Sequence, residues 1–248
     1  MTELSAHEAV RATADPIHDV GSKFMLDPAT FARAAEWGWS NPFAFYFSGR
    51  GGVLGDVDPA VVTAALGWFN PLVVSAMWTE GVAVHGAREA GRRYAEAAAL
   101  WGREHLQGVD GLERFVELGE QLVAGADATG RPLFAAWRAE PGVDDPPGRA
   151  LQLVHMLREW RGANHLVATT SVGLGPLEAI LTNEGESQAK FFGWPEPFPD
   201  CSGIKDLHGE AEDLTDRLCA QAFKTTMTAA ERGEFADAVA VIKTSAGL

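Results

Sequence analysis

Apolar residues recur along this chain at intervals of three and four residues, and the two-residue alternation of half-buried strands is nearly absent. Asp27-Pro28 and Asp58-Pro59 are typical helix-start signals, because aspartate caps free N–H groups and proline suits the first helical turn. The aromatic run at residues 43–47 fits a strand or a buried helix, and we favour helix. The pattern predicts an all-α, multi-helix bundle with helix content well above the roughly one third of average proteins.

Length and local composition bound the domain organisation. The 248 residues fit one large domain or two small ones. The clearest loop is PGVDDPPG at residues 141–148. It divides an N-terminal helical region, residues 1–140, from a C-terminal region, residues 141–248, although a helix connection within one continuous domain fits equally well. With no long apolar run, no apolar N-terminal stretch and only two cysteines, we expect no membrane span and a cytoplasmic location.

The charge balance argues against nucleic acid as a partner. The formal net charge is −14 at pH 7. Between residue 178 and Arg217 the only cations are Lys190 and Lys205, among many carboxylates. Neutralised phosphates supply most of the affinity of proteins for DNA, so an acidic segment is a poor candidate for an interface. We therefore expect no specific DNA binding and no attraction to anionic membranes.

A glycine-rich segment at residues 49–55 partly resembles a nucleotide-binding loop. A dinucleotide fingerprint needs a third glycine, but position 54 is leucine, and no strand–helix alternation surrounds the segment. The sequence predicts a flexible loop instead. Arg50 lies within this segment, just after the aromatic run that contains Tyr46. We expect Arg50 at the mouth of a cavity lined by residues 37–47, where its guanidinium and Tyr46 would bind an anionic ligand.

The helix expected at residues 149–169 has two distinct faces. Apolar side chains, such as Leu153 and Trp160, fall on one stripe. A second, polar stripe carries His155, Arg158, Glu159, Gly162 and His165. Solvation is the simpler explanation of this stripe, but three- and four-residue spacing also lets Arg158, Arg161 and His165 point at one ligand. In that hypothesis the arginines bind its anionic group and His165 is the catalytic acid or base.

Signals for metal and thiol chemistry are weak. The imidazoles of His155 and His165 are ten residues, or about 15 Å, apart on one helix, so they cannot share a metal. No metal-binding spacing occurs, so we predict no metal site, and the cofactor is left open. We expect Cys219 in the core and Cys201 in an exposed loop. Residues 193–203 contain three prolines and are predicted to be irregular.

Three stretches carry a family resemblance: FSGRGGVLG at residues 47–55, GRPLFAA at residues 130–136 and LREWRGANH at residues 157–165. They are similar to an actinobacterial group of MarR-like helix-turn-helix proteins, the SalK/EvbL-like family, often encoded among genes for specialised metabolism. Arg161 and His165 follow the family pattern, whereas Trp160 replaces a histidine. The resemblance implies a winged-helix relative, but the prolines at 195, 197 and 199 leave no room for the strands of a wing.

This resemblance and the acidic C-terminal third together favour a small-molecule-binding protein of specialised metabolism. We leave open whether it is a biosynthetic enzyme acting on an anionic or aromatic substrate. The alternative is a ligand-responsive MarR-like transcription regulator, and a third is a scaffold that pairs only with another protein. Family members form dimers through their terminal helices, so the resemblance implies a homodimer that buries Leu214, Leu218, Phe235 and Val239.

Overall fold

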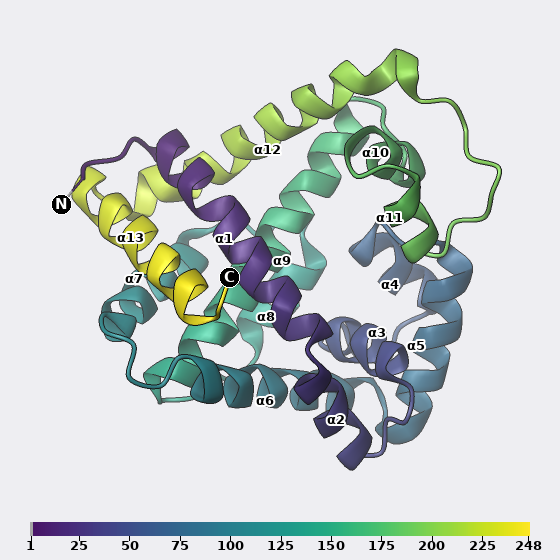
Figure 1. The fold of residues 1–248 in the computed structure, drawn as a ribbon, viewed down its shortest axis with the longest axis horizontal. Helices are drawn as coiled ribbons and strands as arrows, with labels where there is room; N and C mark the ends of the chain where they lie inside the picture. The colour runs from purple at the N-terminus through teal and green to yellow at the C-terminus, as the bar shows by residue number, and fades with distance from the viewer. Residues whose placement is uncertain (1) are drawn as a thin grey trace.

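The computed structural model describes residues 2–248, and all regular secondary structure within them is helical (Figure 1). Helix accounts for 76% of the residues and no strand occurs in the described part, which confirms the predicted all-α class. In chain order the elements are α1 Ala6–Leu26, α2 Pro28–Glu36, α3 Pro42–Gly52, α4 Pro59–Leu66, α5 Pro71–His85, α6 Ala87–His105, α7 Leu112–Gly125, α8 Pro132–Ala139, α9 Pro146–Ser171, α10 Pro176–Asn183, α11 Glu186–Phe191, the 3-10 helix η1 Ser202–Ile204, α12 Lys205–Thr226 and α13 Ala229–Ser245.

Local sequence sets most of the helix starts. Proline occupies the first turn of α2, α3, α4, α5, α8, α9 and α10, where its missing N–H costs nothing. The side chains of Asp27 and Asp58 accept hydrogen bonds from the N–H groups of Ala29 and Ala60, as the sequence predicted. The aromatic run at residues 43–47 is helical and belongs to α3.

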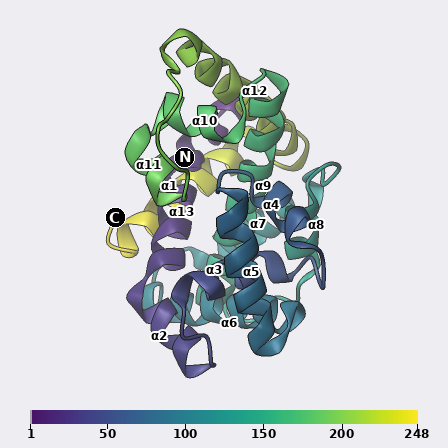
Figure 2. The same cartoon turned by 90° about the vertical axis from the view of Figure 1, so that its right-hand side faces the viewer.

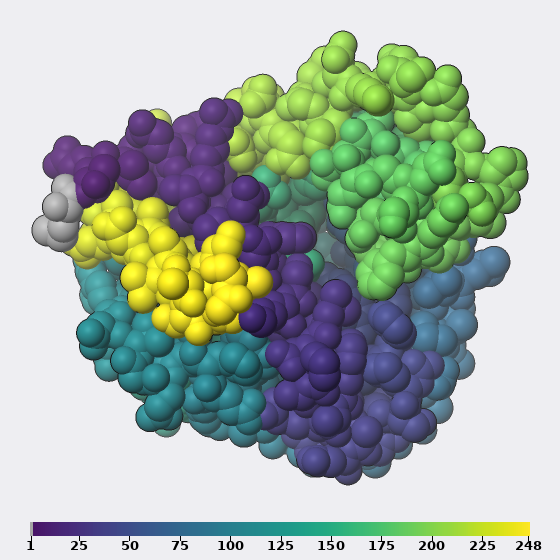
Figure 3. All heavy atoms as spheres, viewed as in Figure 1, coloured from purple at the N-terminus to yellow at the C-terminus, as the bar shows by residue number. Residues whose placement is uncertain are grey.

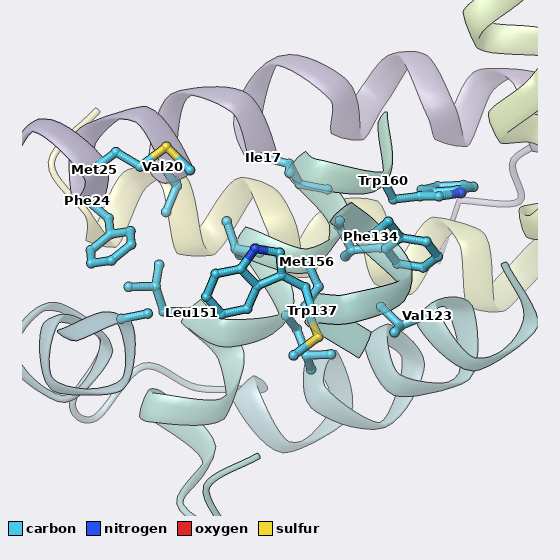
Figure 4. Close-up of a cluster of buried hydrophobic side chains, with 14 of the residues drawn as sticks. Ile17, Val20, Phe24, Met25, Val123, Phe134, Trp137, Leu151, Met156 and Trp160 are labelled. Carbon is cyan, nitrogen blue, oxygen red and sulfur yellow. The ribbon is translucent and has the colours of Figure 1, made fainter. Parts of the chain in front are cut away.

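Helix α9 is the central element of the fold. It packs against α6, α12, α7, α1 and α8. Figure 4 shows Trp137 of α8 and Met156 and Trp160 of α9 within the buried cluster that these helices share. Because α1, α6, α7 and α8 belong to the first 140 residues, these contacts join the two predicted regions. The boundary at residue 140 remains a prediction.

The glycines of residues 49–52 lie in a buried helix, so the prediction of a flexible loop is wrong. They allow α3 and α6 to approach closely. A Cβ at Gly49 would lie 2.3 Å from a ring carbon of Tyr94, and one at Gly52 would lie 2.2 Å from the carbonyl oxygen of Ala87. Periodicity does not distinguish glycine selected for packing from glycine selected for flexibility, which explains the error.

The region after α9 contains a short helix–turn–helix without a wing. Helices α10 and α11 meet at Gly185, whose φ of +83° favours glycine. Helix α10 packs against α12 at one end of the molecule (Figure 2). The chain then runs without regular structure from Gly193 to Cys201, as the prolines predicted. Cys219 is buried as expected, but Cys201 is only 8% exposed, so its predicted exposure is wrong.

The terminal helices close the core of the chain itself. α1 packs against α12 and α13, and α13 also packs against α7. Phe235 and Val239 are buried in this single chain, so they are not available to an interlocking partner, whereas Leu214 and Leu218 are half-buried. The homodimer remains a prediction that these contacts do not test.

Candidate functional site

A cavity of about 740 Å³ lies between α1, α3, α9, α11 and α12. Its opening is visible as a hollow between α1 and the segment that contains α10 and α11 (Figure 3). One wall is aromatic, and its rings come from α3, from the α4–α5 connection and from the end of α11: Phe43, Tyr46, Phe47, Trp68, Phe69, Phe191 and Phe192. Polar side chains of α9, α1 and α12 line another part of the cavity, where the ring of His165 lies 5.3 Å from that of Trp68. The cavity therefore offers a ligand an apolar side and a charged side.

Hydrogen bonds attach the α11 segment to the aromatic wall. The backbone N–H of Asn70 donates to the carbonyl oxygen of Phe192 at 3.0 Å, and the indole of Trp194 donates to the carbonyl oxygen of Trp68 at 2.9 Å. The rings of Phe69 and Phe192 lie 4.4 Å apart between centroids. The short helix–turn–helix is thus part of the cavity wall.

Arg50 and Glu159 form a buried ion pair in the cavity wall. Arg50 Nε and Nη2 donate to the two carboxylate oxygens of Glu159 at 3.0 and 2.9 Å, and Nη1 donates to the hydroxyl of Tyr46. Their side chains are only 8% and 4% exposed. Burial alone would raise the pKa of Glu159, but the charge of Arg50, the smaller effects of His155 and Arg158 and the hydrogen bonds from Arg50 together outweigh it and lower that pKa to about 2. Arg50 is therefore internal, and the prediction that it lies at the mouth is wrong.

Arg158 differs from Arg50 because, within residues 2–248, the only carboxylate near its guanidinium is one that Arg50 already binds. Its Nη1 lies 3.8 Å from Glu159, which Arg50 already engages, and its Nη2 donates to the hydroxyl of Ser22 at 3.3 Å. Gly21 of α1 gives the arginine room, since a Cβ there would lie 2.5 Å from Arg158 Cδ. Two guanidinium groups sharing one carboxylate leave an excess of positive charge on this part of the wall.

The other end of the polar wall brings together Arg161 and His165 of α9 with Glu212 of α12. Arg161 Nη2 lies 2.7 Å from Glu212 Oε2, and His165 Nε2 lies 3.5 Å from Glu212 Oε1. His165 Nδ1 lies 2.9 Å from the hydroxyl of Thr215. Burial lowers the pKa of His165, and Glu212 opposes that effect only in part. The lowered pKa favours the neutral imidazole at pH 7.

All five residues predicted to form the site line this cavity: Tyr46, Arg50, Arg158, Arg161 and His165. His155 does not, although it lies on the predicted polar stripe of the same helix. It is 2% exposed and packs in the core, with its ring centroid 4.4 Å from that of Trp137 and 5.5 Å from that of Tyr94. Burial lowers the pKa of His155 to about 3. Trp37, expected to line the cavity, is not among its lining residues.

Sequence reasoning missed the cavity-lining residues His18, Ser22, His208 and Glu212 of α1 and α12, and also Thr215, which is buried behind His165. His18–Ser22 and His208–Glu212 are each spaced by four residues, a signal for a shared helix face. That spacing does not reveal which distant helix a face meets. Within residues 2–248 no group of three or more metal-ligating side chains is close enough to hold a metal ion.

Comparison with known proteins identifies the family of the chain. Residues 7–198 match a helix-turn-helix family, and because the match covers most of the chain, the protein belongs to that family. No curated protein and no solved structure matches significantly. None of the helices within residues 2–248 is both long and apolar enough to cross a membrane.

Proposed function

We propose that this protein binds a small organic anion in the cavity between α1, α3, α9, α11 and α12. The observation that carries the proposal is the guanidinium of Arg158, which lines the cavity and shares its nearest carboxylate with Arg50. Guanidinium groups bind carboxylates and phosphates through paired, charge-assisted hydrogen bonds. A volume of about 740 Å³ falls in the range of small-molecule sites.

The aromatic wall narrows the ligand class. Aromatic rings and charged side chains line the same cavity, so a ligand with a planar, apolar body and one anionic group would contact both. This arrangement agrees with the role in specialised metabolism that the resemblance to SalK/EvbL-like proteins suggests. Whether the protein also transforms its ligand depends on His165, the predicted catalytic residue.

The first prediction tests the anionic subsite with matched ligands. We expect 2-naphthoate to bind the wild-type protein at least tenfold more tightly than 2-naphthamide, because only the carboxylate pairs with Arg158. Replacing Arg158 with methionine should weaken 2-naphthoate binding about 10- to 100-fold, since hydrogen bonds to charged groups contribute about 1.5–3 kcal/mol. Isothermal titration calorimetry measures both effects.

The control is Arg217→Met, which removes an exposed arginine of α12 outside the cavity. It should leave the affinity unchanged. Equal binding of the acid and the amide, or equal losses in the two variants, would contradict the proposed anion site. Native mass spectrometry of the purified protein gives an independent check, because a co-purifying organic anion should be absent from Arg158→Met.

The second candidate function is a ligand-responsive transcription regulator. Family membership favours it, since a helix-turn-helix typically places its second helix in the major groove of DNA. Two observations oppose it here. The second helix, α11, has six residues and one cation, Lys190, and its end forms part of the cavity wall. We therefore retain ligand binding as the main proposal.

We predict that duplex DNA binds only in the weak, non-specific range of about 10⁻⁴–10⁻⁶ M at physiological salt. The acidic residues around α10 to α12 repel phosphates, and few cations are present to release counterions. Gel-shift titrations with the promoter of the protein's own gene, at low and high salt, measure this. Submicromolar, sequence-dependent binding would favour the regulator over the proposal made here.

A further inference from the structure

The hydrogen bonds around Thr215 fix the proton of His165. Thr215 is fully buried, and its hydroxyl donates to the carbonyl oxygen of Ala211 at 2.7 Å. A hydroxyl has one proton, so towards His165 Nδ1, at 2.9 Å, the Thr215 oxygen accepts. With the Thr215 proton on Ala211, the contact favours the tautomer in which His165 Nδ1 carries the ring proton and Nε2 keeps a lone pair.

The surroundings of Nε2 suit a group that gains a proton. Glu212 Oε1 lies 3.5 Å from Nε2, and Glu212 itself forms an ion pair with Arg161. The ring of His208, also on α12, faces that of His165 at 6.3 Å between centroids. Glu212 favours a positive charge on His165, whereas Arg161 and His208 oppose it. Thr215 on one side and Glu212 on the other thus orient the ring and offset a charge formed on it.

We propose that His165 and Glu212 form a general-base centre, with Thr215 as the positioning residue that directs the lone pair of Nε2 to the ligand. In the step, the O–H bond of a ligand hydroxyl breaks and an N–H bond forms at Nε2. The electron pair remains on the ligand oxygen, which becomes negative, and His165 becomes an imidazolium beside Glu212. Glu212 Oε1, 3.5 Å from Nε2, offsets the positive charge that the ring gains.

The positions of Arg158 and His165 define the ligand further. They lie seven residues apart on α9, which is about two turns and about 10 Å along the helix. The base centre therefore requires an organic anion that carries a hydroxyl at roughly that distance from its charge. This inference rests on the proposed function, because the base acts only on a ligand held in the cavity.

The inference is tested without a ligand, by nitrogen-15 NMR of the histidine side chains. The signals of His165 are those lost in His165→Gln. In the wild type we expect Nδ1 to be protonated at pH 7 and Nε2 to show the shift of an unprotonated nitrogen. We expect its titration midpoint to lie below that of an ordinary histidine. Glu212→Gln should lower this midpoint further, since it removes the charge that favours the imidazolium.

Thr215→Val should shift the ring towards the Nε2-protonated tautomer, because valine has a similar shape and cannot accept the proton. Thr215→Ser should restore the wild-type tautomer. The exposed Glu210→Gln, on the same helix, is the matched control and should change neither property. A protonated Nε2 in the wild type, or a midpoint above that of an ordinary histidine, would overturn the base centre. The binding of 2-naphthoate would be unaffected by that outcome, so the two proposals fail separately.

Discussion

Replacing Arg50 with methionine is expected to lower the free energy of unfolding by about 3–5 kcal/mol, because the variant leaves Glu159 buried without its partner. The pair is enclosed by α3 and α9, and both oxygens of the carboxylate accept from the arginine. The two side chains are only 8% and 4% exposed, so solvent screens the pair weakly. Urea denaturation followed by circular dichroism measures the loss.

The double variant Arg50→Met, Glu159→Met separates the cost of an unpaired charge from the cost of changed packing. Replacing both partners with apolar side chains of similar volume is often neutral, so we expect stability within about 1 kcal/mol of the wild type. A loss below about 1 kcal/mol in the single variant would show that the pair is not buried as described.

The same ion pair makes the stability of the fold depend on pH in the acid range. The pKa of Glu159 in the folded state is about 2, below its ordinary value of 4.5. Because the pKa of Glu159 is lower in the folded state than in the unfolded chain, its ionised carboxylate stabilises the fold at pH values above about 4.5. This contribution to the free energy of unfolding disappears as the pH falls from about 4.5 to 2. The double variant should lack this part of the pH dependence.

Gly52→Ala is expected to destabilise the protein by about 3 kcal/mol or more, the upper end of the cost of overpacking. The new Cβ would lie 2.2 Å from the Ala87 carbonyl oxygen and 2.6 Å from the Gly91 nitrogen. Both are backbone atoms, so α3 and α6 would have to separate. The expected results are a lower melting temperature and the loss of close α3–α6 packing.

Gly209→Ala is the matched control, because this helical glycine of α12 has no neighbour within 4 Å of an added Cβ. Alanine should stabilise that helix by about 0.5–1 kcal/mol. If the two substitutions had similar effects, the close approach of α3 and α6 would not be important for stability.

The sequence predicted the helical class well, because three- and four-residue spacing and Asp-Pro starts are local properties of the chain. It also selected Arg158, Arg161 and His165 together, since one helix brings them to one side of α9. The prediction that His155 belongs to a polar face was wrong, because the position of a residue around a helix does not say which neighbouring helix covers that face. Glu212 and Thr215 were missed for a related reason: local spacing carries no information about which helices pack side by side.

The cavity wall is assembled from both ends of the chain. α1 packs against α12, and Arg11 contacts Asp216 across 205 residues of sequence. At about 5–20 residues per second, a ribosome would deliver α12 and α13 about 10–40 s after α1 itself. During that time the apolar faces of α1 and α9 are uncovered, and neither Glu212 nor Thr215 is present beside His165. A nascent chain therefore has no complete pocket, and binding can begin only when the last helices have docked.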